Sequence, residues 1–284
     1  MGFAAIALLP FLLGPGASDS PEASLQPAPR YAQDLTDEEA VEVFVKLAKD
    51  KKAVPDLLVF GIDDLQKRYA ASADRALRAF DKLESGEGKA SDWKKLIKAE
   101  VDTQEELAKG VWAAFRYRKE VNDQHMQVWR RGITAFGNMG EHGSEYLWEI
   151  FEDKRFSRDG GFRGRCVEEI GRTRDYEQYE ALLDLLDHHL EEVVVGVGKA
   201  FLHYDKAPGK IRRECTEKLV RAVESYRSRG QGGENINGPR IWGKVKGPLM
   251  AALKSLTGKS YSTSLDWTKF WNEYKNDKAM WSDD

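Results

Sequence analysis

The fold is decided by residues 163–204, which read RGRCVEEIGRTRDYEQYEALLDLLDHHLEEVVVGVGKAFLHY. Apolar residues recur at helical spacing in three pieces, 163–172, 176–186 and 191–203, and short polar turns separate the pieces. Two short amphipathic helices joined by a turn cannot bury their apolar faces alone, so each pair must stack on another. The stretch therefore predicts an all-α protein built from stacked helix pairs.

A repeating register indicates how far the stack extends. Phe136, Ile170 and Phe201 occupy equivalent places near the ends of first helices. The matching second helices are expected to bury Leu147, Ile150, Phe151, Leu182, Leu183, Leu186, Cys215, Leu219 and Val223. We therefore expect about four irregular repeats over residues 123–275.

Two groups of motifs carry a family resemblance. Ile170-Gly171-Arg172 ends a first helix, Asp175 breaks the chain, and a leucine-rich second helix follows. The last segment carries Leu256-Thr257-Gly258-Lys259 and then Asp266, Trp267, Phe270 and Trp271. The first group resembles a HEAT-like repeat of the short, lyase-associated type, and the second is similar to the closing segment of bacterial secreted HEAT-repeat proteins. The resemblance implies an α-α superhelix sealed by aromatic rings, with a short tail over residues 276–284.

The sequence departs from the family pattern in two places. Val194 and Val195 stand where many such repeats carry a ladder of Arg or Asp. The glycine-rich residues 228–240 are predicted to form a loop that interrupts the third repeat. Both departures predict an irregular superhelix, and the resemblance itself says almost nothing about function.

Residues 31–122 are predicted to form an irregular helical region that packs on the array or caps it. Thr36 and Glu39 have the spacing of a capping box, and so do Asp102 and Glu105, with Asp in place of Ser or Thr. The predicted helices cover residues 36–50, 56–71, 73–83, 93–101 and a last one that opens at Asp102, with Leu47, Leu57 and Phe60 among the buried residues.

The first 30 residues predict export. Residues 3–13 form an apolar run that is too short to span a membrane, which takes about 20 residues. Small residues follow the run as at a secretory cleavage site, although no Lys or Arg precedes it; a buried N-terminal helix is the alternative. We predict a signal peptide over residues 1–18, a Ser/Pro-rich tether over residues 19–30, and a mature chain that is periplasmic or extracellular.

Composition limits the classes of partner and chemistry. The 284 residues are 41% hydrophobic and include eight Trp, which is enough for a large core. A net charge of −3 argues against a surface devoted to nucleic acid. Cys166 and Cys215 lie on apolar stripes and are expected to be free buried thiols rather than a disulfide or metal site.

The sequence predicts no catalytic residue, metal site or cofactor. His188 and His189 are adjacent, whereas a metal site on a helix needs a spacing of three or four, so a capping role is expected. The sequence contains neither a phosphate-binding loop with Lys-Ser/Thr nor a Gly-x-Ser-x-Gly elbow. A lyase-like enzyme rests on the resemblance alone.

Charge is distributed unevenly along the predicted array. Residues 139–193 contain 15 acidic and 7 basic residues, whereas residues 206–246 contain 11 basic and 4 acidic ones. Solvated helix faces or mutual pairing would explain this asymmetry without any ligand. The residues with which the basic region would contact a ligand are Arg227, Arg229, Arg240, Trp242 and Lys244.

The predicted function is a monomeric, non-catalytic scaffold that binds a protein partner through a solenoid surface. The alternative is binding of an anionic polymer or glycan through residues 206–246. A scaffold predicts an exposed apolar or acidic groove, whereas an anion binder predicts that its Arg and Lys side chains converge on one concavity.

Overall fold

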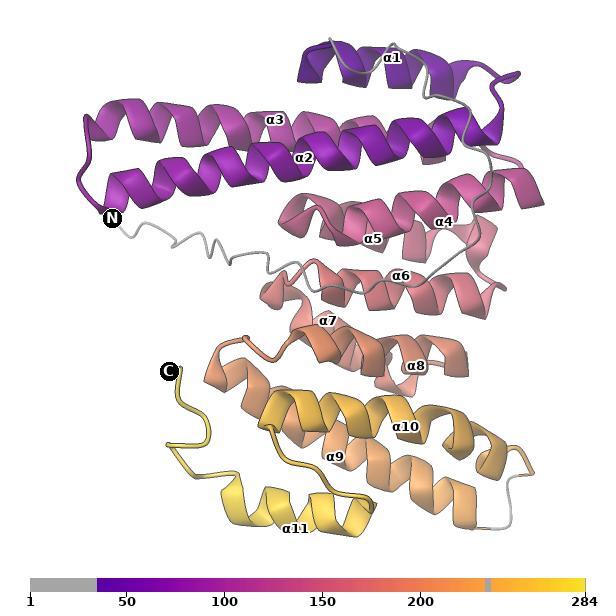
Figure 1. Ribbon diagram of the computed structural model, residues 1–284. Helices are drawn as coiled ribbons and strands as arrows, with labels where there is room; N and C mark the ends of the chain where they lie inside the picture. The colour runs from indigo at the N-terminus through magenta and orange to yellow at the C-terminus, as the bar shows by residue number, and fades with distance from the viewer. Residues whose placement is uncertain (1–34, 233–235, 284) are drawn as a thin grey trace, which may run out of the picture.

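The computed structural model describes residues 35–232 and 236–283, and these residues form helices without any β-strand (Figure 1). The predicted all-α class is confirmed. The predicted signal peptide and tether lie outside the described residues. The helices are α1 (Asp37–Lys49), α2 (Pro55–Glu84), α3 (Ala90–Tyr117), α4 (Asp123–Gly137), α5 (Gly140–Glu152), α6 (Gly160–Arg172), α7 (Tyr179–Asp184), α8 (Glu191–Ala200), α9 (Gly209–Gln231), α10 (Gly238–Thr257) and α11 (Ser264–Tyr274).

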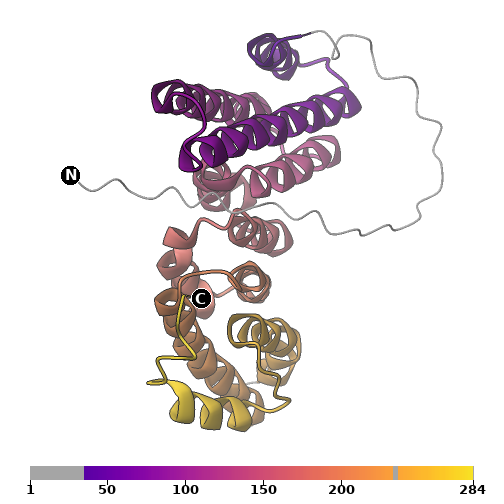
Figure 2. The ribbon, with the colours of Figure 1, turned by 60° about the vertical axis from the view of Figure 1, so that its left-hand side comes forward.

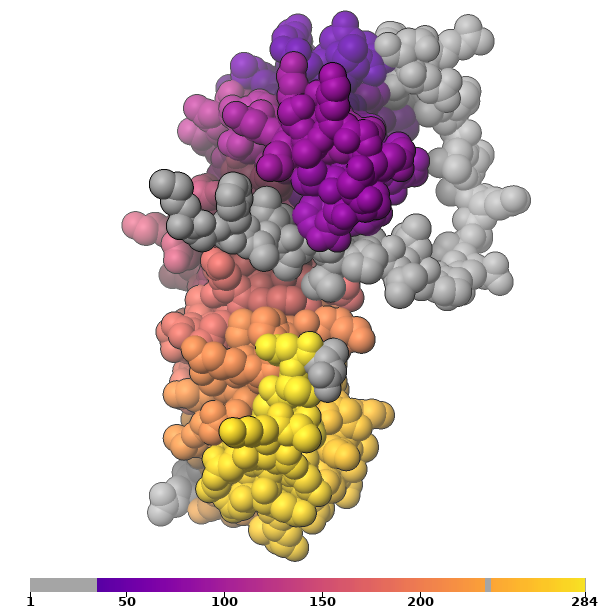
Figure 3. All heavy atoms as spheres, turned by 90° about the vertical axis from the view of Figure 1, so that its left-hand side faces the viewer, coloured from indigo at the N-terminus to yellow at the C-terminus, as the bar shows by residue number. Residues whose placement is uncertain are grey.

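The helices pack in two rows (Figure 2). In the even row, α2 packs against α4, α4 against α6, α6 against α8 and α8 against α10. In the odd row, α1 packs against α3, α3 against α5, α7 against α9 and α9 against α11. The result is an elongated stack with α1 at one end and α11 at the other (Figure 1, Figure 3).

Residues 163–204 fold as their periodicity predicts. They form most of α6, then α7 flanked by two short 3-10 segments, then α8 followed by a third 3-10 turn. The expected stripe residues Cys166, Ile170 and Leu182 are fully buried. Cys166 and Cys215 are separate buried thiols, and burial raises the pKa of both.

The helix break predicted near residues 71–73 is wrong, because α2 is continuous there. Ser72 is buried, and its hydroxyl donates hydrogen bonds to the Glu100 carbonyl at 3.0 Å and to Glu100 Oε2 at 2.8 Å. A residue type that is common at helix ends serves here to join α2 to α3.

The helix start predicted at Asp102 is also wrong. α3 runs continuously through it, and Asp102 and Glu105 are both exposed. The capping box at the start of α1 is confirmed: Glu39 N–H donates to Thr36 Oγ1 at 3.2 Å, and Thr36 N–H donates to Glu39 Oε2 at 2.7 Å. Capping-box spacing therefore marks a helix start only where the chain before it is non-helical.

The predicted loop over residues 228–240 is helical at both of its ends. α9 extends to Gln231 and α10 begins at Gly238. Gly230 lies against the Trp242 side chain, and Gly238 lies against the backbone of α9, so neither position has room for a Cβ. The glycines are explained by the close crossing of two helices rather than by an open loop.

α11, the last helix of the odd row, covers α9 with aromatic rings. Trp267 and Phe270 are buried where α11 packs on α9, and their ring centres are 5.7 Å apart in an edge-on arrangement. The segment predicted as a tail returns to the start of α9, where Arg212 Nη2 donates to the Ser282 carbonyl at 2.7 Å. The C-terminal end of the stack is therefore covered by both α11 and the segment after it.

Candidate functional site

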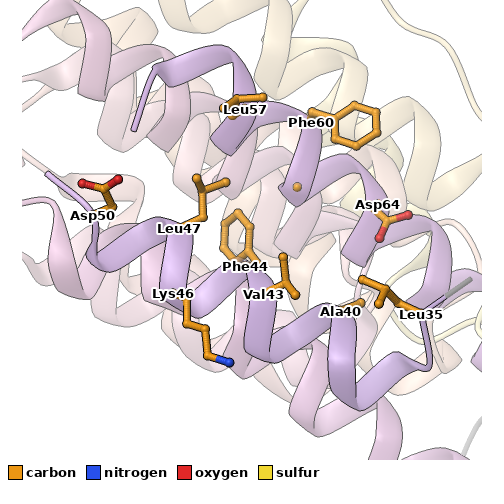
Figure 4. Close-up of a pocket in the computed structure, with 11 residues that line it drawn as sticks. Leu35, Ala40, Val43, Phe44, Lys46, Leu47, Asp50, Leu57, Phe60 and Asp64 are labelled. Carbon is orange, nitrogen blue, oxygen red and sulfur yellow. The ribbon is translucent and has the colours of Figure 1, made fainter. Parts of the chain in front are cut away.

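An apolar groove lies between α1 and α2, at the N-terminal end of the stack (Figure 4). Its volume is about 460 Å³, within the range of about 300–1,000 Å³ that is typical of binding pockets. Charged residues lie only along its rim. Its apolar lining comes from Leu35, Val43, Phe44, Leu47, Leu57 and Phe60.

The floor of the groove is the ring of Phe44, which lies on the backbone of α2. Phe44 is buried, and its ring takes the space that a side chain at Gly61 would fill. The rest of α1 packs mainly on α3, where Val41 lies against Gly110. Because α1 packs mainly on α3, it covers the outer side of α2 only in part.

Two large apolar side chains on the walls of the groove are open to solvent. Val43 of α1 is 47% exposed and Leu57 of α2 is 40% exposed. The prediction that Leu57 is buried is wrong, because its side chain lines the open groove. Contiguous exposed apolar surface of this kind marks interaction sites on soluble proteins.

A polar network fixes the start of α1 at the rim of the groove. Arg68 Nη1 donates to the Leu35 carbonyl at 2.9 Å and lies 3.0 Å from an Asp37 carboxylate oxygen, while its Nε donates to Asp64 at 2.9 Å. Asp37 belongs to α1, whereas Arg68 and Asp64 belong to α2. The network thus holds the two walls together at one end without filling the apolar floor.

Three of the five predicted contact residues gather beside the acidic segment 187–192. Arg240 and Lys244 both pair with Glu191, and Lys244 Nζ also lies 3.2 Å from Glu192. Arg229 lies 3.6 Å from Asp187. Hydrogen bonds from Arg240 and Lys244 lower the pKa of Glu191. The acidic and basic regions of the chain therefore pair with each other where they meet.

The other two predicted contact residues make separate contacts. Arg227 pairs with Glu224 on its own helix and donates to Gln231 at 2.8 Å. Trp242 is half-buried against α9, with Lys246 Nζ 5.8 Å from its ring centre. The structure therefore places Trp242 in the contact between α9 and α10.

A second pocket, over α6 and α8, has charged walls. Glu168 lies 2.9 Å from Arg165 and 3.1 Å from Lys199, which links the two helices across the pocket. Acidic and basic side chains thus neutralise one another on its walls. These ion pairs join α6 and α8 close to Val195. Val195 is one of the two positions at which this sequence lacks the ladder of Arg or Asp found in many HEAT-like repeats.

Glu169 is a fully buried carboxylate in α6. Its Oε1 lies 2.5 Å from Arg165 Nη2 and its Oε2 lies 3.0 Å from Arg172 Nε. Burial raises the pKa of Glu169 to about 7 despite the two cations. Since the side chain has no exposed surface, it has no open face for a substrate.

The adjacent histidines have a structural role. His188 Nδ1 accepts a hydrogen bond from the Leu190 N–H at 3.0 Å, and the rings of His188 and His189 stack with centres 4.3 Å apart. Burial lowers the pKa of His188, which suits a neutral acceptor. The expected capping role is seen at the start of α8 rather than at the end of the preceding helix. Across residues 35–232 and 236–283, no group of three His, Cys, Asp or Glu could hold a metal ion.

No family model matches the sequence, and no curated protein or solved structure matches it significantly either. Among the described helices, none has the length and apolar character needed to cross a membrane. The likeness to HEAT-like repeats therefore rests on the sequence motifs given above.

Proposed function

We propose that this chain is a non-catalytic, HEAT-like scaffold that binds a protein partner in the groove between α1 and α2. The observation that carries the proposal is the pair of exposed walls, Val43 and Leu57, above the buried ring of Phe44 (Figure 4). Apolar side chains gain free energy when they leave water, so such a groove favours an apolar ligand surface.

The partner surface that fits the groove is the apolar face of an amphipathic helix. α1 has 13 residues and is therefore about 20 Å long. A helix laid beside it would present an apolar residue at about three successive turns, with spacings of three and four. It would also pack on the outer side of α2, the position of the next helix in the even row.

Binding of an anionic polymer or glycan is the second candidate. The gathering of Arg229, Arg240 and Lys244 favours it. Against it, an incoming anion would have to displace carboxylates that already pair with these cations. Replacing one exposed ion pair by another gains little free energy. A lyase-like activity has only the resemblance in its favour.

The experiment is site-specific photo-crosslinking in the cell that produces the protein, with a benzophenone amino acid at position 57. We expect one discrete partner, linked through a segment whose apolar residues recur three and four apart. The added substitution Val43→Glu should abolish the crosslink, because it places a charge on the apolar wall.

Matched variants separate the two candidates. Arg240→Glu with Lys244→Glu should leave the crosslink at position 57 intact. Capture should also persist in about 0.5 M salt, where charge attraction is screened beyond a few ångströms. Loss of capture in the charge-reversed variant or in salt, together with tolerance of Val43→Glu, would overturn the groove proposal in favour of anion recognition.

A further inference from the structure

The connected ends of α2 and α3 project past α1 and α4 as an arm (Figure 1). The arm is defined here as residues 76–99, whose side-chain hydrogen bonds and ion pairs all stay within α2, α3 and the turn between them. Ala76 and Ala79 are buried between the two helices. At the base of the arm, Arg75 Nε donates to Glu100 Oε1 at 2.7 Å. The arm is therefore an ordered extension of the two helices beyond the stack.

The arm carries lysines on the face of α3 that packs on α5 further along the helix. Trp112 lies five helical turns after Lys94 and therefore shares a face with Lys94 and Lys98. The Trp112 ring stacks on Tyr146 of α5, with ring centres 5.3 Å apart. Lys94, Lys95 and Lys98 are exposed and form no ion pair with any residue that the structure describes. On the arm, this face of α3 is thus basic and open to a second molecule.

A face of glutamates begins next to the lysines. Glu105 is two turns after Lys98 on the same face of α3, and α5 adds three exposed glutamates, Glu141, Glu145 and Glu149. Within the described residues, no cation pairs with any of the four. Burial and neighbouring carboxylates raise the pKa of Glu141 and Glu149. Elsewhere in the described chain a spacing of four often holds an ion pair, whereas on α5 it holds like charges, which destabilise a helix. Cations from a second molecule would therefore stabilise this face.

We propose that two copies of this chain form a two-fold dimer in which the arm of each copy lies on the glutamate face of the other. Lys98 and Glu105 share one face of α3, so a two-fold axis between them sets each Lys98 opposite the Glu105 of the other copy. Lys94 then extends towards Glu145 on α5 of the other copy. The two surfaces have complementary charge, and neither gives up an ion pair that it already holds, in contrast to the basic side chains beside residues 187–192.

A second copy fits this surface better than an anionic polymer or an anionic membrane does. Glu105 lies roughly 10 Å from Lys98 along α3, within the distance over which charges interact at physiological salt. A polyanion on the lysines would therefore be repelled by the adjoining glutamates. A dimer departs from the monomer that the sequence predicts. It uses neither the groove nor the protein partner of the proposed function, so the two proposals can fail separately.

The experiment measures self-association of the full chain by sedimentation equilibrium at about 0.02 M and about 0.5 M salt. We expect a dimer at low salt, with a dissociation constant that rises by about tenfold or more at high salt. Lys94→Glu with Lys98→Glu should give a monomer, and so should Glu105→Lys with Glu145→Lys, because each double variant sets like charges opposite one another. An equal mixture of the two double variants should dimerise again, because both reciprocal contacts then join opposite charges.

The matched control is Lys51→Glu with Lys52→Glu, which makes the same change of net charge in the exposed turn after α1 and should leave the association unchanged. Circular dichroism checks that each variant is folded, and the salt dependence of the native chain needs no variant. Three results would overturn the dimer: a native chain that is monomeric at about 100 μM and low salt, a dimer that persists in either double variant, or a mixture that stays monomeric. If the native chain is monomeric and binds a polyphosphate column through Lys94 and Lys98, the arm serves an anionic polymer instead.

Discussion

The two ends of the helix stack are finished differently. At the C-terminal end, α11 places Trp267 and Phe270 in full burial against α9, and the chain then folds back over the start of α9. At the N-terminal end, α1 covers α3 but leaves Val43 and Leu57 open on the side of α2. A stack needs both ends covered to be stable alone, so the incompletely covered end is the candidate for binding.

The difference originates in the residues that each terminal helix supplies. α11 offers large aromatic side chains, each of which buries about 150–250 Å². The buried side chains of α1 are Ala40, Phe44 and Ala48, of which only one is large. A helix with one large and two small buried residues covers one neighbour, and the second neighbour remains accessible.

The largest expected effect tests the closed end. Trp267→Ala should lower the free energy of unfolding by about 3–5 kcal/mol, because the ring is fully buried and the cavity left behind cannot collapse completely. Chemical denaturation measures this loss. The matched control is Leu265→Ala on the same helix, which should cost about 0.5 kcal/mol or less because that side chain is exposed. Equal losses for the two variants would show that α11 does not close the stack.

The stretch that the sequence predicted best is the middle of the stack. In residues 163–204, polar turns separate short apolar stripes, and each helix ends where its stripe ends. The sequence predicts shorter helices in place of α2 and α3, with breaks at Ser72 and Asp102, and both residue types also occur at helix ends. Whether such a residue ends a helix or lies inside one depends on its hydrogen-bond partner. For Ser72 that partner is Glu100, which is too far away in the sequence to belong to a local pattern.

The second prediction concerns Glu169 of α6, which lies in the middle of the stack, away from both of its ends. Its pKa in the folded state is about 7, above the ordinary value of 4.5 that applies in the unfolded chain. The folded state therefore binds the proton more tightly, so the contribution of Glu169 to stability is complete below pH 4.5 and is lost as the pH rises through 7. A difference of this size corresponds to about 3 kcal/mol.

The measurement compares the native protein with Glu169→Gln by chemical denaturation at pH 5 and pH 8. The unfolding free energy of the native protein relative to the variant should fall by up to about 3 kcal/mol between these pH values. Glu152→Gln, which changes an exposed glutamate of α5, should show no such trend. A constant difference for Glu169→Gln would mean that Arg165 and Arg172 keep the carboxylate ionised at both pH values.

The groove could not be predicted from the sequence, for a physical reason. Val43 and Leu57 belong to amphipathic helices, and their spacing is compatible with a buried stripe. Whether they are buried depends on how α1 leans between α2 and α3, which is set by Phe44 against Gly61 and Val41 against Gly110. Of the five predicted contact residues, the structure brings together Arg229, Arg240 and Lys244, but the sequence could not show which carboxylates they pair with, namely Asp187 and Glu191.

The smallest expected effect tests the open end. In the chain without residues 1–18, Val43→Glu should change the free energy of unfolding by about 0.5 kcal/mol or less, because the side chain lies at an exposed position of α1. Phe44→Ala, one residue further along the same helix, should cost about 3–5 kcal/mol, since it removes the buried floor of the groove. Thermal or chemical unfolding at low protein concentration measures both. If Val43→Glu instead costs about 2 kcal/mol or more, then something covers position 43 in solution. A dependence of that cost on protein concentration would identify a second copy as the cover, and the open end would then be an interface between copies of this chain.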